Sequence, residues 1–454
     1  MHLKLTTYFS ILFLFFFNFH VSSQNKINLT IKNIKKDSVM IAYYYGDKQF
    51  ILGDDNGKNH YIKFDENGKG EFISNELKKG LYLLVFPPNN EYVQFLFDEN
   101  DLDISLDRNS LQEGLRFKNS LTNTLFYQHI TFIKVLTEER EEILKNHSKG
   151  VNDKEIEEKA SLLDTKYQNY SKDFISKYSH NLAAQLLKSN SNVEIPSEYT
   201  TNEERFNYYK KNYFNNIDFN NPWLIRTPFF HNKVEYYIEN LTSKAPYEII
   251  KSVDYILDSM KNTPDLFKYF VVNFLNKYAK SKLMTSENIY AHIVKNYYLT
   301  GKANWVDKDQ LDKIIDNYNR IKNSLIGSIV NDFELISSTH KTSKLYDDNS
   351  EFKILYFWKS TCKECNLDEY VNKIPKNTKL YSIPTDFDKK QLNTYTKSNK
   401  PYFLPSIISD KDKTLVLNQL NINSYLHIFL LDKNNEIIGK RISFEQVLEI
   451  INNN

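Results

Sequence analysis

The sequence predicts a secreted chain with three folded parts, in the order β-sandwich, α-helical domain and α/β domain. Its 454 residues exceed the roughly 100–200 of one typical domain. Short alternating segments come first, helical periodicity follows, and strands then alternate with helices. These changes of pattern predict a signal peptide at residues 1–23, the sandwich at 24–118, the helical domain at 119–325 and the α/β domain at 326–454.

The composition excludes several classes of protein. An apolar content of 41% is enough for packed cores, and aromatic residues reach 15%. The 59 Lys and Arg nearly balance the 57 Asp and Glu, so the net charge of +2 argues against a nucleic-acid partner. With only 11 Gly and 11 Pro, collagen-like and Pro-rich chains are excluded. Two cysteines cannot form a disulfide framework.

The N-terminus has the pattern of a cleavable secretory signal. Lys4 supplies the positive charge, residues 8–19 form an apolar run, and Val21-Ser22-Ser23 offers small residues for cleavage. The run is shorter than the roughly 20 residues of a membrane span, although an uncleaved anchor stays an alternative. The residue directly after the predicted cleavage site is Gln24 and not a cysteine, so no lipoprotein anchor is expected. We therefore expect no stable membrane span after cleavage and a location in the periplasm or cell envelope, an oxidising compartment.

The first folded part has the pattern of a small antiparallel sandwich. Alternating or apolar strands are predicted at residues 27–31, 38–45, 80–86 and 93–97. Turn signals such as Glu66-Asn67-Gly68 separate them. Nothing in this part suggests catalysis, and its aromatic residues are better explained as core or as a docking surface than as a ligand site.

The middle part is predicted to be helical and the last part α/β. Helical spacing of apolar residues predicts helices at 120–146, 155–180, 245–262, 264–282 and 307–323. In the α/β part the sequence predicts a hairpin of 332–336 with 344–346, strands at 352–358 and 379–383, helices at 362–371, 388–398 and 414–420, a hairpin of 428–432 with 436–441, and a last helix at 443–452. Ser443 is the expected N-cap of that last helix.

Both cysteines lie in one motif, Cys362-Lys363-Glu364-Cys365, between a predicted strand and a predicted helix. On the first turn of a helix, residues i and i+3 face the same way, so the two sulfurs can form a bridge. Unpaired N–H groups and the helix dipole would stabilise a thiolate there. We expect Cys362 to be the attacking thiolate and Cys365 to resolve the mixed disulfide.

Three other interpretations of the motif remain open. The pair could be half of a zinc site, but zinc usually takes four ligands, and no second Cys pair or closing His motif is present. It could be a purely structural disulfide, although so short a loop constrains the unfolded chain little. It could also belong to a redox-inert domain that is kept for binding. We expect neither a metal nor a cofactor.

The strand, Trp358 and the Cys-x-x-Cys helix together resemble the thioredoxin superfamily, and most closely its TlpA/ResA-type periplasmic members. The segment 326–335 is similar to that group's opening segment without its proline, and 429–440 resembles its final hairpin. Pieces such as 224–228 and 301–305 make the whole chain resemble a multidomain envelope protein with β-rich and helical N-terminal domains of unknown function and a C-terminal redoxin domain. The resemblance implies a thioredoxin-like fold.

Some positions depart from the thioredoxin pattern. Leu426 stands where the superfamily has a cis-proline that faces the Cys pair, and a cis bond before a non-proline costs about 2.5–4 kcal/mol. We therefore predict a trans Tyr425–Leu426 bond or a strained one. Tyr356 replaces a buried Asp, and His427 would lie near the sulfurs, more plausibly as a bystander than as an aid to thiolate formation. Asp368 matches the carboxylate of a Cys-x-x-Cys-x-x-Glu pattern, which implies a proton relay to Cys365 unless it only favours the helix dipole.

The predicted function is thiol–disulfide oxidoreduction through Cys362, Cys365 and Asp368, with a protein thiol or disulfide as substrate and a second protein as redox partner. The alternative is an envelope interaction module with a degenerate or redox-inert thioredoxin-like domain. Peroxidase activity is a weaker alternative, because the Pro-x-x-x-Thr-x-x-Cys context usual in peroxiredoxins is absent.

Overall fold

The computed structural model describes residues 25–34, 39–53, 61–147, 153–362, 365, 367–370, 372–399, 401–423 and 426–453. The predicted signal peptide lies outside these residues. The chain forms two compact units, residues 1–233 and 234–454, and the finer division into four parts stays a prediction. No helix within the described ranges is both long and apolar enough to cross a membrane.

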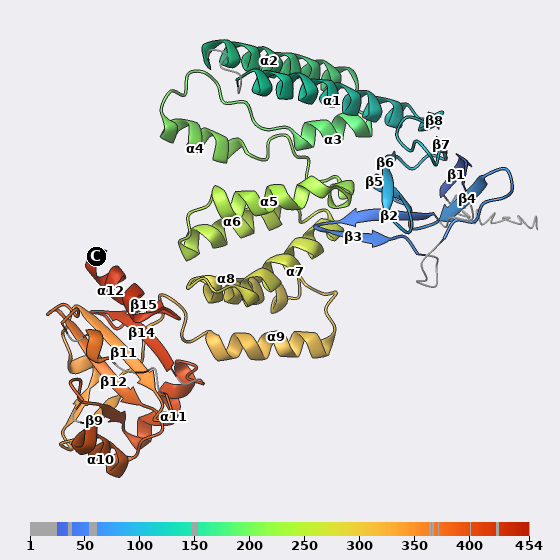
Figure 1. Ribbon diagram of the computed structural model, residues 1–454. Coiled ribbons are helices and arrows are strands. Elements are labelled where there is room, and N and C mark those ends of the chain that lie inside the picture. Colours follow the sequence, from blue (N-terminus) through green and yellow to red (C-terminus); the bar gives the residue numbers. More distant parts are fainter. Residues whose placement is uncertain are drawn as a thin grey trace, which may run out of the picture. The chain divides into compact units, whose positions relative to one another are not determined.

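The first unit begins with two four-stranded sheets (Figure 1). One has the order β4-β1-β7-β8, formed by Lys69–Ser74, Asn25–Lys32, Leu102–Asp107 and Arg116–Lys118. The other has the order β3-β2-β5-β6, formed by Lys48–Ile51, Met40–Tyr45, Gly80–Phe86 and Glu91–Phe97. Both sheets contribute to one hydrophobic core, in which Ile27 and Leu29 of β1 join Tyr82 of β5 and Phe95 of β6.

The predicted all-antiparallel pairing of this part is wrong for one pair of strands. β1 pairs in parallel with β7, and Leu29 lies opposite Ile104. The alternation of apolar residues marks which face of a strand is buried, but it carries no information about the direction of a partner that is distant in the sequence. The local prediction is good, because Ile27, Leu29 and Ile31 are buried while Thr30 and Lys32 are exposed.

Helices complete the first unit: α1 (Leu121–His147), α2 (Asp153–Lys177), α3 (Leu182–Asn190), α4 (Asn202–Asn212) and the short 3-10 helix η1 (Pro222–Arg226). The predictions at 120–146 and 155–180 are confirmed by α1 and α2. Helix α4 was not predicted, although Thr201 and Glu204 form a capping box at its start. It buries no residue, so the periodic apolar stripe on which the prediction relied is missing. Helix α5 (Pro228–Asn240) includes the point where the second unit begins.

The second unit starts with helices α6 (Pro246–Ser259), α7 (Pro264–Lys280), α8 (Ser286–Ile293) and α9 (Lys308–Ile321), with the π-helical η2 (Val294–Tyr298) after α8. The predictions for α6, α7 and α9 are confirmed. Proline at the first position fits the start of α6 and of α7, because the first turn has no partner for its N–H groups. Asp307 caps α9 by accepting from the backbone N–H of Gln310 at 2.9 Å.

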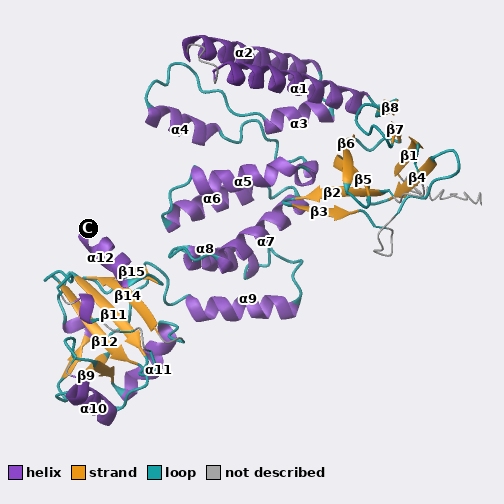
Figure 2. Ribbon diagram, in the orientation of Figure 1, coloured by secondary structure: helices purple, strands orange, loops and turns teal. Residues whose placement is uncertain are grey.

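The C-terminal part of the second unit is an α/β layer structure (Figure 2). Its main sheet has the order β12-β11-β14-β15, formed by Thr378–Pro384, Phe352–Trp358, Leu426–Asp432 and Ile437–Lys440. β11 is parallel to β12 and antiparallel to β14. A small sheet joins β9 (Glu334–Ser337), β10 (Thr342–Lys344) and β13 (Ser406–Ile408). The helices are α10 (Lys389–Asn399), α11 (Asp410–Gln419) and α12 (Phe444–Asn453), with short 3-10 turns η3 (Leu345–Asp347) and η4 (Asp368–Tyr370).

Helices cover both faces of the main sheet. Ile354 and Tyr356 of β11 pack in the same cluster as Val447 of α12, whereas Leu355 and Phe357 belong to the cluster that contains Val416 of α11. The predicted hairpins, strands and last helix are confirmed to within a few residues. Ser443 caps α12 as predicted, since its hydroxyl accepts from the Gln446 N–H at 3.3 Å.

Candidate functional site

Cys362 and Cys365 form a disulfide just after the carboxyl end of β11, with their Cα atoms 5.5 Å apart. Both residues are half-buried. Cys365 packs against the cluster that contains Tyr356 and Phe444. The prediction that these two sulfurs come within bonding reach is therefore confirmed.

The predicted helix at 362–371 is wrong for the residues that the structure describes there. Cys362, Cys365 and Leu367 are outside any helix, and only Asp368–Tyr370 form a 3-10 turn, η4. The segment is rich in poor helix formers, including asparagine, aspartate, tyrosine and valine, and Pro375 limits its length. The helix dipole that was expected to stabilise the Cys362 thiolate is thus not provided by an α-helix in the described residues.

The loop that leads to Cys362 is anchored on the neighbouring parallel strand. The backbone N–H of Ser360 donates to both carboxylate oxygens of Asp386 at 3.0 Å, and its hydroxyl donates to Oδ2 at 2.5 Å. The N–H of Thr385 donates to the carbonyl of Trp358 at 2.8 Å. Sequence reasoning missed Asp386. The signal was available, because loops after adjacent parallel strands meet at the same edge of a sheet.

Leu426 begins β14 at the same edge, directly opposite Trp358 of β11. Its side chain is 38% exposed. The predicted Tyr425–Leu426 bond lies outside the described residues, because Tyr425 is not among them. Leu426 and the disulfide therefore lie at the same end of the sheet, as the resemblance to thioredoxins implies.

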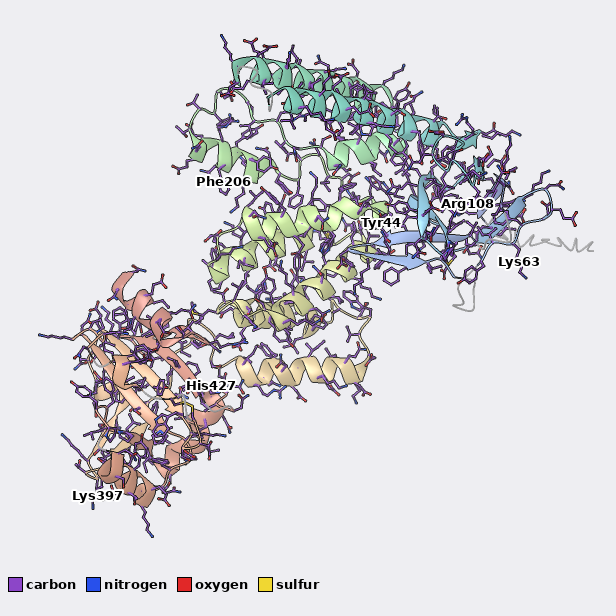
Figure 3. The ribbon with its side chains drawn as sticks, in the orientation of Figure 1. Tyr44, Lys63, Arg108, Phe206, Lys397 and His427 are labelled. Carbon is purple, nitrogen blue, oxygen red and sulfur yellow. A yellow bond between two sulfur atoms is a disulfide. The ribbon has the colours of Figure 1, made fainter. Side chains whose placement is uncertain are left out.

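His427, labelled in Figure 3, is the second residue of β14. Burial is the main cause that holds its pKa below the usual value, and the charges of Lys440 and Lys359 add to it. Its Nε2 accepts the backbone N–H of Asn423 at 3.3 Å. A lowered pKa favours the neutral form of the ring, and the bystander role of His427 stays a prediction.

The remaining predicted site residue, Asp368, begins η4, but its side chain lies outside the described part of the structure. Next to it, Tyr370 donates its hydroxyl to Glu445 of α12 and packs on Phe444 with ring centroids 4.4 Å apart. That hydrogen bond is the main cause that lowers the pKa of Glu445 to about 2. Tyr356, at the position of the expected buried Asp, is 3% exposed, and burial raises its pKa to about 12. The proton-relay role of Asp368 stays a prediction.

A cleft of about 900 Å³ within the second unit reaches this edge of the sheet. On the α/β side it is lined by Leu367, which lies two residues after Cys365, and by Leu426. On the other side it is lined by Tyr278, Ala279, Glu287, Tyr290, Asn317 and Ile321 from α7, α8 and α9. These helical residues had no place in the predicted site, because no sequence motif marks them.

A buried ion pair fixes the two walls of the cleft to each other. Lys440 at the end of β15 donates to Oε2 of Glu287 on α8 at 2.5 Å and to the carbonyl of Ser324 at 2.6 Å. The side chains of Lys440 and Glu287 are only 5% and 17% exposed. The side chain of Asn288 makes two hydrogen bonds with the backbone of Ile326. Its Nδ2 donates to the carbonyl of Ile326 at 2.8 Å, and its Oδ1 accepts from the N–H of Ile326 at 3.2 Å.

One family model matches part of this chain. The family model "Domain of unknown function (DUF5106)" matches residues 147–324, which covers most of the helical region. No curated protein matches the chain.

Several solved structures that are similar to this chain are described as thioredoxin-like or as thiol-disulfide oxidoreductases or isomerases. A thioredoxin-like protein from Bacteroides caccae is 16% identical over 57% of this chain and 97% of its own, with a TM-score of 0.42. The thioredoxin domain of a thiol-disulfide oxidoreductase from Bacteroides vulgatus is 20% identical over 28% and 96%, with a TM-score of 0.26. A domain of a possible thiol-disulfide isomerase from Cytophaga hutchinsonii is 24% identical over 28% and 92%, with a TM-score of 0.26.

Proposed function

We propose that this protein is a thiol–disulfide oxidoreductase of the TlpA/ResA type that acts in the periplasm or cell envelope after its signal peptide is removed. The observation that carries the proposal is the half-buried Cys362–Cys365 disulfide at the carboxyl end of β11. A purely structural bridge over so short a loop would stabilise the chain little. A bridge between two cysteines at a loop beside a cleft suits exchange with another protein.

The exchange uses the two sulfurs and needs no cofactor. In the reduced protein, the Cys362 thiolate attacks one sulfur of a client disulfide, and the other client sulfur leaves as a thiolate. The Cys365 thiolate then attacks Cys362 Sγ, which releases the second client thiolate and forms the Cys362–Cys365 bond. Two electrons pass to the client, and a redox partner protein restores the dithiol. The reverse sequence oxidises a client dithiol.

Trapping of the mixed disulfide tests these roles. In the Cys365→Ser variant the second step is blocked, so a covalent adduct between Cys362 and the client should accumulate on a non-reducing gel. The Cys362→Ser variant is the matched control and should form none. Equal trapping by both variants, or turnover by Cys362→Ser at the wild-type rate, would contradict the assignment.

One observation favours the second candidate function, an envelope interaction module whose redox domain is inert. In the described residues no α-helix begins at Cys362, and only the 3-10 turn η4 lies close after it in the chain, so the usual dipolar stabilisation of a thiolate is missing. A disulfide that resists reduction by thioredoxin-range reductants in the full-length protein would support this candidate over the oxidoreductase.

A further inference from the structure

The cleft beside the disulfide has one wall from the helical region and one from the α/β region of the second unit. Its volume of about 900 Å³ lies near the top of the ~300–1,000 Å³ range of ligand pockets, so it is larger than one side chain requires. Its lining includes Leu367, two residues after Cys365 in the chain, and Leu426, which lies opposite Trp358 at the sheet end that leads to Cys362. A polypeptide whose cysteine reacts there would have its neighbouring residues inside the cleft.

The lining suits a peptide chain. The amide side chains of Asn317, Asn421 and Asn423 can each both donate and accept hydrogen bonds, as a peptide backbone requires. Leu426, which lines the cleft opposite Trp358 of β11, adds a part-exposed apolar surface. Such a mixture binds an extended segment without demanding one sequence.

Two cations at the end of β15, Lys440 and Arg441, favour an acidic residue of the client. Glu287 on α8 pairs with both cations, Lys440 at 2.5 Å and Arg441 at 3.1 Å, so these three side chains together carry a net positive charge. Lys440 is buried, whereas the Arg441 side chain is 45% exposed and lines the cleft. Arg441 has a φ of 56°, a left-handed conformation that is uncommon for arginine and that fixes where its side chain starts.

Besides Glu287, two acidic residues line the cleft, Glu369 and Glu445. Glu445 accepts a hydrogen bond from Tyr370, and its pKa is lowered in part by the charge of Lys373. Lys373 also lies 5.1 Å from the centroid of the Tyr370 ring. Glu369, on η4, belongs to the same side of the cleft. These two acidic groups therefore lie on η4 and at the start of α12, whereas Arg441 pairs with Glu287 of the helical wall.

We propose that this cleft binds an extended segment of the client polypeptide, with the reacting cysteine at Leu426 and an acidic side chain at Arg441. The inference rests on the proposed oxidoreductase function. The inference gives a function to the region that the family model matches, because α7, α8 and α9 of that region provide the wall that selects clients.

The test compares small and peptide disulfides as substrates of the reduced full-length protein. Hydroxyethyl disulfide is too small to need the cleft. The peptide probes are short, closed by one disulfide, and carry Glu, Gln or Lys at successive positions after the second cysteine. At one position we expect the Glu peptide to react about fivefold faster than the Gln peptide. The Arg441→Gln variant should abolish that preference and keep the rate with hydroxyethyl disulfide. Arg140→Gln removes an exposed arginine that pairs with Asp164 and is the matched control.

A steric variant tests the helical wall separately. Ala279 is exposed at the end of α7 and lines the cleft, so Ala279→Trp should slow every peptide about tenfold while hydroxyethyl disulfide reacts at the wild-type rate. Asn276→Trp, on an exposed position of the same helix outside the lining, should change neither rate. If all probes react but neither charge nor bulk at these positions matters, the cleft is not the client site. If no probe reacts at all, it is the proposed function that fails.

Discussion

The buried Lys440 is the most informative residue to change, because it fixes the α/β region to α8. The Lys440→Met variant keeps most of the side-chain volume and removes the ammonium. Glu287 keeps Arg441 as a partner, but the buried carbonyl and hydroxyl of Ser324 lose the donor that lies at 2.6 and 3.2 Å. An unsatisfied buried acceptor costs ~1–3 kcal/mol and a broken buried ion pair ~3–5, so we expect a loss of about 3 kcal/mol in local stability.

Hydrogen exchange of the full-length chain measures this local stability directly. Each 1.36 kcal/mol changes an opening equilibrium tenfold, so amides of α8 and β15 should exchange about 100-fold faster in Lys440→Met. Arg441→Gln should change exchange less than about fivefold, because its partly exposed pair is worth at most ~1 kcal/mol. Exchange in Lys440→Met within threefold of the wild type, or equal effects of both variants, would refute the reasoning.

Three further outcomes are expected. Gly68→Ala should lower the thermal midpoint of unfolding more than Gly301→Ala. Both glycines have a left-handed φ, +71° and +76°, but only at Gly68 would an added Cβ meet a backbone atom, the carbonyl oxygen of Ile31 at 2.1 Å. Equal shifts of the two midpoints by calorimetry would contradict this. Tyr370→Phe should raise the pKa of Glu445 from about 2 toward the usual carboxyl range, which NMR titration measures. In the wild type, the stability that Glu445 contributes is present above its unfolded pKa and is lost as the pH falls toward 2. His427→Asn should leave the pH profile of disulfide exchange unchanged between about pH 6.5 and 8, since the pKa of this histidine lies below its usual value; a lost inflection there would show that the ring titrates in the reaction.

The parts of the fold that the sequence predicts well are those with strong local patterns. The predicted bounds of β11 are the observed ones. Its short, nearly continuous apolar run is typical of a strand that is buried on both faces, and all seven residues are buried. The Ser443 cap and the final hairpin follow from local chemistry in the same way. The parallel pairing of β1 with β7 could not be predicted, because the two strands are far apart in the sequence and no local pattern indicates the direction in which they pair.

The site was predicted only in its covalent centre. The spacing and context of Cys362 and Cys365 indicate a disulfide without any knowledge of the fold. The 3-10 turn after them depends instead on tertiary anchors, such as Tyr370 on Phe444, which outweigh the weak helix propensity of the segment. The cleft wall from α7 to α9 consists of residues without a motif, and the last of them, Ile321, lies 31 residues before the start of β11. Only the folded structure therefore brings this wall to the α/β part.

The reduction potential of the Cys362–Cys365 pair in the full-length protein tests the central claim most directly. A reversible two-electron titration in glutathione or dithiothreitol buffers, read by thiol alkylation and mass spectrometry, gives the value. The account predicts a midpoint within the range of exchange catalysts, about −120 to −270 mV. A pair that stays oxidised to below about −300 mV, as structural disulfides do, or that never reacts, would contradict it.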